Sequence, residues 1–108
     1  MLQEIERLRK KWIEECLDGD VGLHVVAADV RELLSPEASV EQVCSLALEA
    51  IRPLVMARRF QAADMRPGGF VPWECSPEEA LGQIRREWLV LGREPGISDV
   101  CWFIPGGE

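Results

Sequence analysis

One stretch, GGFVPWECSPEEALGQIRREWLVLG from Gly68 to Gly92, limits the possible folds of this chain more than any other. Ser76 is a predicted N-cap, Pro77 fits the first helical position, and Glu79 is placed to complete a capping box. The residues that follow supply an apolar stripe, and Gly92 suits the left-handed conformation that ends many helices. The sequence therefore predicts a sharply bounded helix directly after a short extended segment.

Three earlier helices are predicted from apolar residues that recur at spacings of three and four. The first ends at the turn Asp18-Gly19-Asp20, whose last residue is expected to cap the second helix. Ser35-Pro36 is expected to stop that second helix. The third begins with a capping box of Ser39 and Gln42, and Pro53 inside it should kink the helix or end it early.

The period then changes from helix to strand. Residues 58–64 alternate, MRPGG provides a turn, and residues 70–73 read as a second strand, with a loop too long for a two-residue turn. Strand formers at residues 100–104 predict a third strand. This order predicts an α+β fold, winged-helix-like and mainly helical with a small antiparallel sheet, in which Arg58–Trp73 is the wing. A generic α+β fold is the alternative.

Length and composition indicate one domain over residues 1–108. The N-terminus is charged from residue 3 onward and no apolar run approaches the length of a membrane span, so we expect a cytoplasmic protein without membrane contact. The four cysteines are 28, 31 and 26 residues apart with no CxxC pair, which predicts reduced packing residues. Neither a metal nor a cofactor is expected.

Charge is distributed unevenly along the chain, although its sum is −7. Residues 13–49 carry nine acidic groups and one basic group, whereas residues 50–73 carry four basic groups and one acidic group. The four basic residues are Arg52, Arg58, Arg59 and Arg66. They are the candidate contacts of a winged-helix DNA-binding regulator that would use the Arg58–Trp73 hairpin. The predicted recognition helix presents Glu41 and Glu49, which repel phosphate, so nucleic acid is an unfavoured partner.

The sequence contains no catalytic motif, and we expect no enzyme activity. The only histidine, His24, has Asp20 four residues before it but no serine or cysteine at helical spacing to activate. Adjacent pairs such as Glu14-Glu15 diverge around a helix and are explained as surface charge. The glycine pairs are turn signals and do not form a phosphate-binding loop.

Binding of another protein is the favoured function. Trp73 and Trp102 lie at predicted strand ends beside Glu74 and Asp99, and aromatics rimmed by carboxylates suit a partner with a basic surface. The predicted contacts are therefore Trp73, Glu74, Glu78, Glu79, Asp99 and Trp102. The alternative, which the sequence favours slightly, is that both tryptophans simply cover the small sheet. A homodimer is also open, because the apolar stripe of the first helix fits either its own core or a second copy.

Four segments of the chain carry a resemblance. They are GDVGL at 19–23, GGFVPW at 68–73, SPEEA at 76–80 and EWLVLGREPGISDVCWF at 87–103. Together they resemble a group of short uncharacterised bacterial proteins, some of which look like immunity proteins that neutralise secreted toxins by direct binding. His24 departs from that pattern, where a polar or aromatic residue is expected. The resemblance implies a small acidic protein-binding module, with a basic toxin or nuclease as one form of partner, and it implies no catalytic residue.

Overall fold

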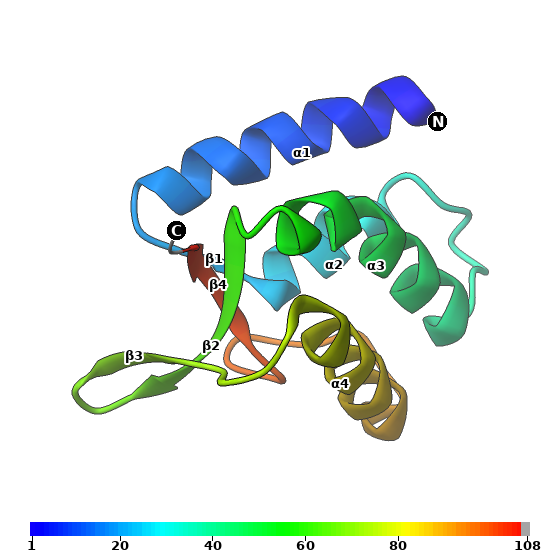
Figure 1. The fold of residues 1–108 in the computed structure, drawn as a ribbon. Helices are drawn as coiled ribbons and strands as arrows, with labels where there is room; N and C mark the ends of the chain where they lie inside the picture. The colour runs from blue at the N-terminus through cyan, green and yellow to red at the C-terminus, as the bar shows by residue number, and fades with distance from the viewer. Residues whose placement is uncertain (107–108) are drawn as a thin grey trace.

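Four helices and a four-stranded antiparallel sheet make up residues 1–106, which the computed structural model describes, so the fold is α+β. Residues 107–108 of the expected domain lie outside the described part. The helices are α1 (Leu2–Leu17), α2 (Leu23–Arg31), α3 (Val40–Met56) and α4 (Pro77–Leu91), and the strands are β1 (Val21–Gly22), β2 (Phe60–Arg66), β3 (Gly69–Pro72) and β4 (Trp102–Pro105). Figure 1 shows α1 along the top, α3 and α4 side by side on the right, and the β2–β3 hairpin projecting to the lower left. No helix in this part of the chain is long and apolar enough to cross a membrane.

The sheet has the strand order β1-β4-β2-β3. β4 lies inside it, because Phe103 is the partner of Val21 on one side and of Ala62 on the other. The predicted hairpin and the predicted third strand are therefore confirmed. β1 was not predicted, since two residues are too few to show an alternating pattern.

The core lies between the helices and one face of the sheet. Trp12 of α1 and Trp88 of α4 are fully buried. The rings of Phe60 and Phe103 stack with centroids 5.3 Å apart on the core side of the sheet. The apolar stripe of α1 packs on this core within the monomer; its buried residues are Ile5, Leu8, Trp12 and Cys16. All four cysteines are free, and three of them are buried.

The predicted starts of α3 and α4 are confirmed. Ser39 and Gln42 form one capping box, Ser76 and Glu79 form the other, and both hydrogen bonds of each box are present. α4 ends at Gly92 in the left-handed conformation, with φ 70°. These signals are local in the sequence, so their geometry follows from a few neighbouring residues.

Three predictions about boundaries were wrong. Asp20 does not cap α2; the N-cap is Gly22, without a side-chain cap, because pairing with Trp102 draws this segment into the sheet. α2 ends at Arg31, before the expected stop at Ser35-Pro36. The hairpin loop has two residues, since Arg66 pairs directly with Gly69.

Pro53 does not end α3, which continues to Met56. Proline has no backbone N–H, so the Glu49 carbonyl one turn earlier lacks its usual helical partner. Arg9 of α1 lies against this point: its Nε–H donates to the Ala50 carbonyl at 2.8 Å, and an Nη2–H reaches the Glu49 carbonyl at 3.4 Å. The proline therefore coincides with a polar contact that ties α1 to α3.

Candidate functional site: the projecting hairpin and the open face of the sheet

The outer half of the β2–β3 hairpin stands away from the helices (Figure 1) and exposes apolar side chains. Met65 and Val71 are 49% and 50% exposed. Side chains alternate between the two faces of a strand, so these two residues lie on opposite faces of the arm. A projecting arm with accessible apolar groups on both sides is suited to contact with another protein.

One face of the sheet is buried by the core and the other is only partly covered. Phe60, Ala62 and Phe103 point into the core and are at most 2% exposed. The alternation places Gln61 and Trp102 on the opposite face, and both are half-buried. We call this second side the open face of the sheet.

An aromatic row crosses the open face. The rings of His24 and Trp102 meet edge to face with centroids 5.4 Å apart, and Trp102 meets Phe70 at 5.8 Å. Ala63, the register partner of Trp102, is fully buried even though it lies on this face. Gly22 makes room for the row, because a Cβ there would lie 2.3 Å from the His24 ring. The row brings together side chains from three distant parts of the chain.

A notch of about 250 Å³ lies where the hairpin meets the loop before β4. It is lined by Asp64, Met65, Arg66, Ser98, Val100, Cys101 and Trp102. Ser98 and Val100 have φ angles of 69° and 65°, and a β-branched residue with positive φ is a clear outlier. Strain of this kind persists only where surrounding contacts enforce it, and it concentrates at functional sites. The indole N–H of Trp102 has no hydrogen-bond partner within the described chain.

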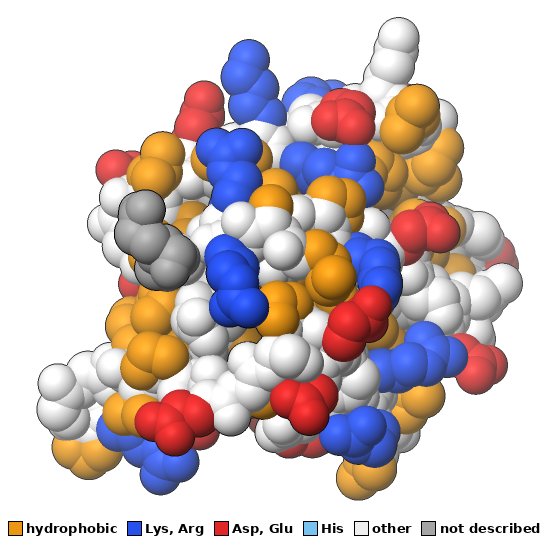
Figure 2. Space-filling view, in the orientation of Figure 1, with side chains coloured by type: hydrophobic (Ala, Val, Ile, Leu, Met, Phe, Trp, Pro, Cys, Tyr) orange, Lys and Arg blue, Asp and Glu red, His pale blue; other side chains and the backbone are white. Residues whose placement is uncertain are grey.

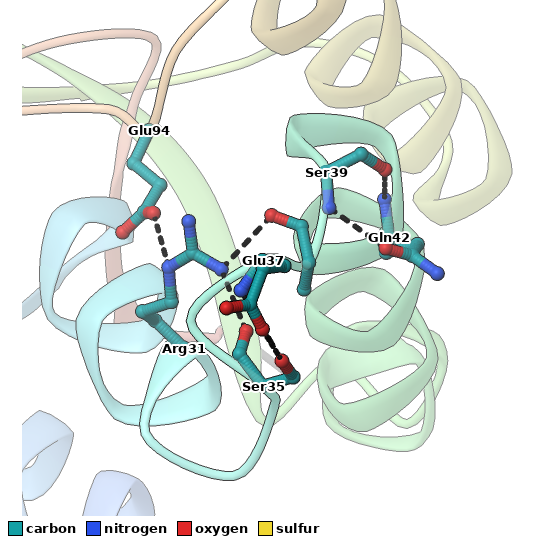
Figure 3. A network of polar contacts seen from close by, with 7 residues as sticks. Arg31, Ser35, Glu37, Ser39, Gln42 and Glu94 are labelled. Carbon is teal, nitrogen blue, oxygen red and sulfur yellow. Dashed lines mark hydrogen bonds and ion pairs between the residues drawn. The ribbon is translucent and has the colours of Figure 1, made fainter.

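Ion pairs hold the strained loop in place. Arg93 contacts Asp99 at 2.9 Å, and Asp99 also accepts the Gly96 backbone N–H at 2.8 Å. These hydrogen bonds, the backbone one first, lower the pKa of Asp99 below its usual value. At the start of the loop, Glu94 pairs with Arg31 at 2.8 Å. Figure 3 shows the Arg31 guanidinium between Glu94 and the turn that joins α2 to α3.

Cys101 lines the notch but is not a candidate nucleophile. Burial, aided by the nearby negative charges of Glu87 and Asp64, raises the pKa of its thiol far above the usual value. The thiolate is the reactive form of cysteine, so this side chain acts as an apolar packing group at neutral pH. No group of three or more metal-ligating side chains occurs among residues 1–106.

The two tryptophans predicted as contacts are not neighbours on one face. Trp102 lies on the open face, whereas Trp73 continues the other face of β3 and donates its indole N–H to Asp64 at 3.0 Å. Gln61 fixes the same segment by donating to the Trp73 carbonyl at 3.0 Å. Trp73 therefore supports the base of the hairpin, and Trp102 is the tryptophan of the aromatic row.

Three of the four predicted contact carboxylates already have partners within the protein. Glu78 pairs with Arg52, and Asp99 is held by Arg93. Glu79 completes the capping box, and its hydrogen bonds to Ser76 lower its pKa. Glu74 is exposed, and within residues 1–106 it has no ion pair.

The predicted DNA-contacting arginines divide into two pairs. Arg52 and Arg66 are matched by Glu78 and Asp64. Arg58 and Arg59 are exposed and have no ion pair with another described residue. Figure 2 shows basic side chains gathered over α1 and over the junction of α3 with β2, with apolar side chains between them.

Sequence reasoning missed Met65, Phe70, Ser98 and Val100 as parts of the candidate site. For Phe70 a signal existed, because it alternates with Val71 in a predicted strand and had to face one side of a sheet. For Ser98 and Val100 none existed, since neither residue type favours a positive φ. Their conformation is imposed by tertiary contacts.

No protein-family model, curated protein or solved structure matches this chain. The resemblance to short bacterial proteins stays a prediction, and no residue role comes to this chain from a relative.

Proposed function

We propose that this protein is a binding module for another protein and that the hairpin and the open face of the sheet form its contact surface. The observation that carries the proposal is the set of accessible apolar groups, Met65, Val71 and the aromatic row, held beside a strained and ion-paired loop. Aromatic residues and methionine are enriched in the centres of protein interfaces.

The partner has a basic surface. The chain has a net charge of −7, and several carboxylates in the described part make no ion pair with another described residue. Among them are Glu14, Glu15, Asp18, Asp20 and Glu74. Such charge speeds the approach of a basic protein and selects against acidic ones. Neutralisation of a basic toxin or nuclease, as by an immunity protein, is one form of this function.

Enzyme activity has no support in the geometry of the titratable groups. The aromatic neighbour of His24 is the indole of Trp102, at a centroid distance of 5.4 Å, and not a serine or cysteine. The Cys101 thiol is held in its protonated form by burial.

The test uses the tagged protein to isolate its partner, which is then purified, and binding is measured by calorimetry. Met65→Asp places a charge on the exposed arm and should weaken binding at least tenfold, because it desolvates a carboxylate in an apolar contact. Val90→Asp is the matched control, since Val90 of α4 is 87% exposed and lies outside the site. Equal weakening by both variants, or by neither, would remove the hairpin from the interface.

Reversing the charge of acidic residues separately tests the proposed electrostatic attraction to a basic partner. Glu74→Lys should slow association, with the effect largest at low salt. Unchanged association of the purified partner after reversal of Glu74, Glu78 and Glu79 together would exclude this acidic face.

A winged-helix DNA-binding regulator is the second candidate. In this chain, as in such a domain, helices are followed by a hairpin. Of the four arginines predicted to contact DNA, Arg58 and Arg59 have no ion pair within residues 1–106 and are available for phosphate contacts. Two cations support only weak and salt-sensitive binding. Fluorescence anisotropy with labelled duplex DNA at low and near-physiological salt distinguishes the candidates: binding that falls steeply with salt and is lost in Arg59→Gln would favour the regulator.

A further inference from the structure

A second recess, away from the notch, lies between α1 and the turn that joins α3 to β2. Its volume is about 410 Å³, within the range of small-molecule sites. It is lined by Ile13, Cys16, Leu17, Ala57, Arg58, Arg59, Phe60, Pro105 and Gly106. The lining thus includes apolar residues of α1 and two consecutive arginines. We call it the arginine groove.

The arginines sit on a helix end of defined geometry. The Arg59 N–H donates to the Leu54 carbonyl at 2.9 Å, and the Arg58 N–H donates to the Val55 carbonyl at 3.0 Å. These two bonds are those of a Schellman motif, and Arg58 occupies its left-handed position with φ 60°. Glycine is the usual residue there, because a side chain in that conformation costs about 1–2 kcal/mol.

Gly106, the residue that follows β4, contacts the same turn. The Gly106 N–H donates to the Arg59 carbonyl at 3.0 Å, and a Cβ on Gly106 would lie 1.7 Å from the Arg58 carbonyl oxygen. The backbone of the two arginines is thus preorganised. A left-handed arginine in a turn that glycine would suit better indicates that its side chain has a use.

Among residues 1–106, no carboxylate lines the groove or pairs with these cations. Cys16 lines the groove as a neutral thiol, since burial and the nearby negative charge of Asp20 raise its pKa to about 11. The groove therefore combines two cations with apolar lining residues on a chain whose net charge is −7.

We propose that the arginine groove binds a small amphiphilic carboxylate, a medium-chain fatty-acid anion. The guanidinium groups of Arg58 and Arg59 take the carboxylate, for which their planar fork is suited. The alkyl chain lies along Ile13 and Leu17, and Leu17 at the rim is 72% exposed and gains cover from it. This inference is independent of the protein-binding function, because the groove shares no lining residue with the notch.

The experiment is a titration of decanoate, below its micellar concentration, into the full chain, followed by calorimetry and by amide NMR shifts. Decanoate should bind and shift the amides of Leu17, Arg58 and Arg59. Arg58→Gly removes one cation while suiting the left-handed turn, and Arg59→Gln removes the other; each should weaken binding at least fivefold. Arg86→Gln on α4 is the matched control and should bind as the wild type does.

Two further experiments test the chemical class of the ligand. Decanol has the same chain without the carboxylate and should bind at least tenfold more weakly. Leu17→Asp, at a rim position that does not support the core, should abolish decanoate binding while the circular dichroism spectrum is unchanged. Absence of decanoate binding, equal binding of decanol, or full affinity in both arginine variants would overturn the proposal. Loss of decanoate binding with intact binding of the protein partner would separate it from the proposed function.

Discussion

α3 and α4 begin in the same way and end differently. Each starts from a serine N-cap whose hydroxyl accepts the backbone N–H three residues on at 3.1 Å. α4 then ends at Gly92, with φ 70°, and α3 is followed by Arg58, with φ 60°. The backbone conformation is nearly the same at both ends, but only α4 has the residue that adopts it without strain.

The difference indicates that the preference of this backbone conformation for glycine is satisfied at Gly92 and overridden at Arg58. At Gly92 a side chain would meet nothing within 4 Å, and glycine there serves the backbone alone. At Arg58 the side chain is kept at a conformational cost, and it lines the arginine groove. Ser98 and Val100 show the same departure at the notch. The non-glycine residues with positive φ therefore mark both surfaces for which we propose ligands.

Of the substitutions that test this comparison, Gly106→Ala is expected to lower the free energy of unfolding most. It disturbs the contact between Gly106 and the Arg58 turn. The added methyl group would overlap the Arg58 carbonyl, so the end of β4 has to move and the protein should lose about 1–3 kcal/mol of unfolding free energy. Urea unfolding followed by tryptophan fluorescence measures it. Gly68→Ala, at a loop position with open space, is the control. A loss no larger than that of the control would show that β4 does not constrain the turn.

Exchange of the two left-handed residues is expected to change stability in opposite directions. Gly92→Ala should lower the free energy of unfolding by about 1–2 kcal/mol, because it forces a side chain into the left-handed conformation. Arg58→Gly should raise it by about 0.5–1 kcal/mol, since relief of strain exceeds the added entropy of the unfolded chain. Both values come from urea titrations at one pH. Destabilisation by Arg58→Gly would mean that the arginine side chain, rather than its backbone, supports the fold.

The matched starts of the helices should respond alike. Ser39→Ala and Ser76→Ala each remove one capping acceptor and should each cost about 1 kcal/mol. Equal losses in urea unfolding are expected because both boxes have the same hydrogen bonds. A loss confined to one variant would show that its helix is held by packing rather than by its cap.

These features also separate what the sequence could predict from what it could not. The capping boxes and the helix end at Gly92 could be predicted, because each depends on residues within a few positions of one another. The sequence around Asp20 could not show that this residue fails to cap α2. The segment pairs instead with Trp102, which lies 82 positions after Asp20 in the chain. Arg58 was recognised as a cation, but arginine gives no sequence signal for the left-handed conformation that it adopts.

The candidate contact surface shows the same limit. Trp102 was predicted as a contact from its neighbours in sequence, yet its place in a row with His24 and Phe70 depends on the strand order β1-β4-β2-β3. Trp73 had the same local signature and lies on the other face. Strand order arises from long-range pairing, which a single sequence does not display.

The smallest expected effect concerns pH, because the two capping boxes differ in one respect. The third helical residue is Gln42 in α3 and Glu79 in α4, and only the glutamate titrates. Backbone and side-chain hydrogen bonds with Ser76 lower the pKa of Glu79 in the folded protein. Its contribution to stability is therefore present at neutral pH, where the carboxylate is ionised in both states, and is lost as the pH falls through the lowered folded pKa.

The stability difference between the wild type and Glu79→Gln isolates this contribution. It should favour the wild type at pH 7 and shrink as the pH falls below the ordinary pKa of glutamate, about 4.3. Gln42→Glu should give α3 the same dependence, because the Ser39 backbone N–H would then donate to a carboxylate. Urea midpoints of the three proteins between pH 3 and 7 measure both changes. A difference that stays constant across that range would show that the Ser76 box is held by geometry alone, with no share from the charge of Glu79.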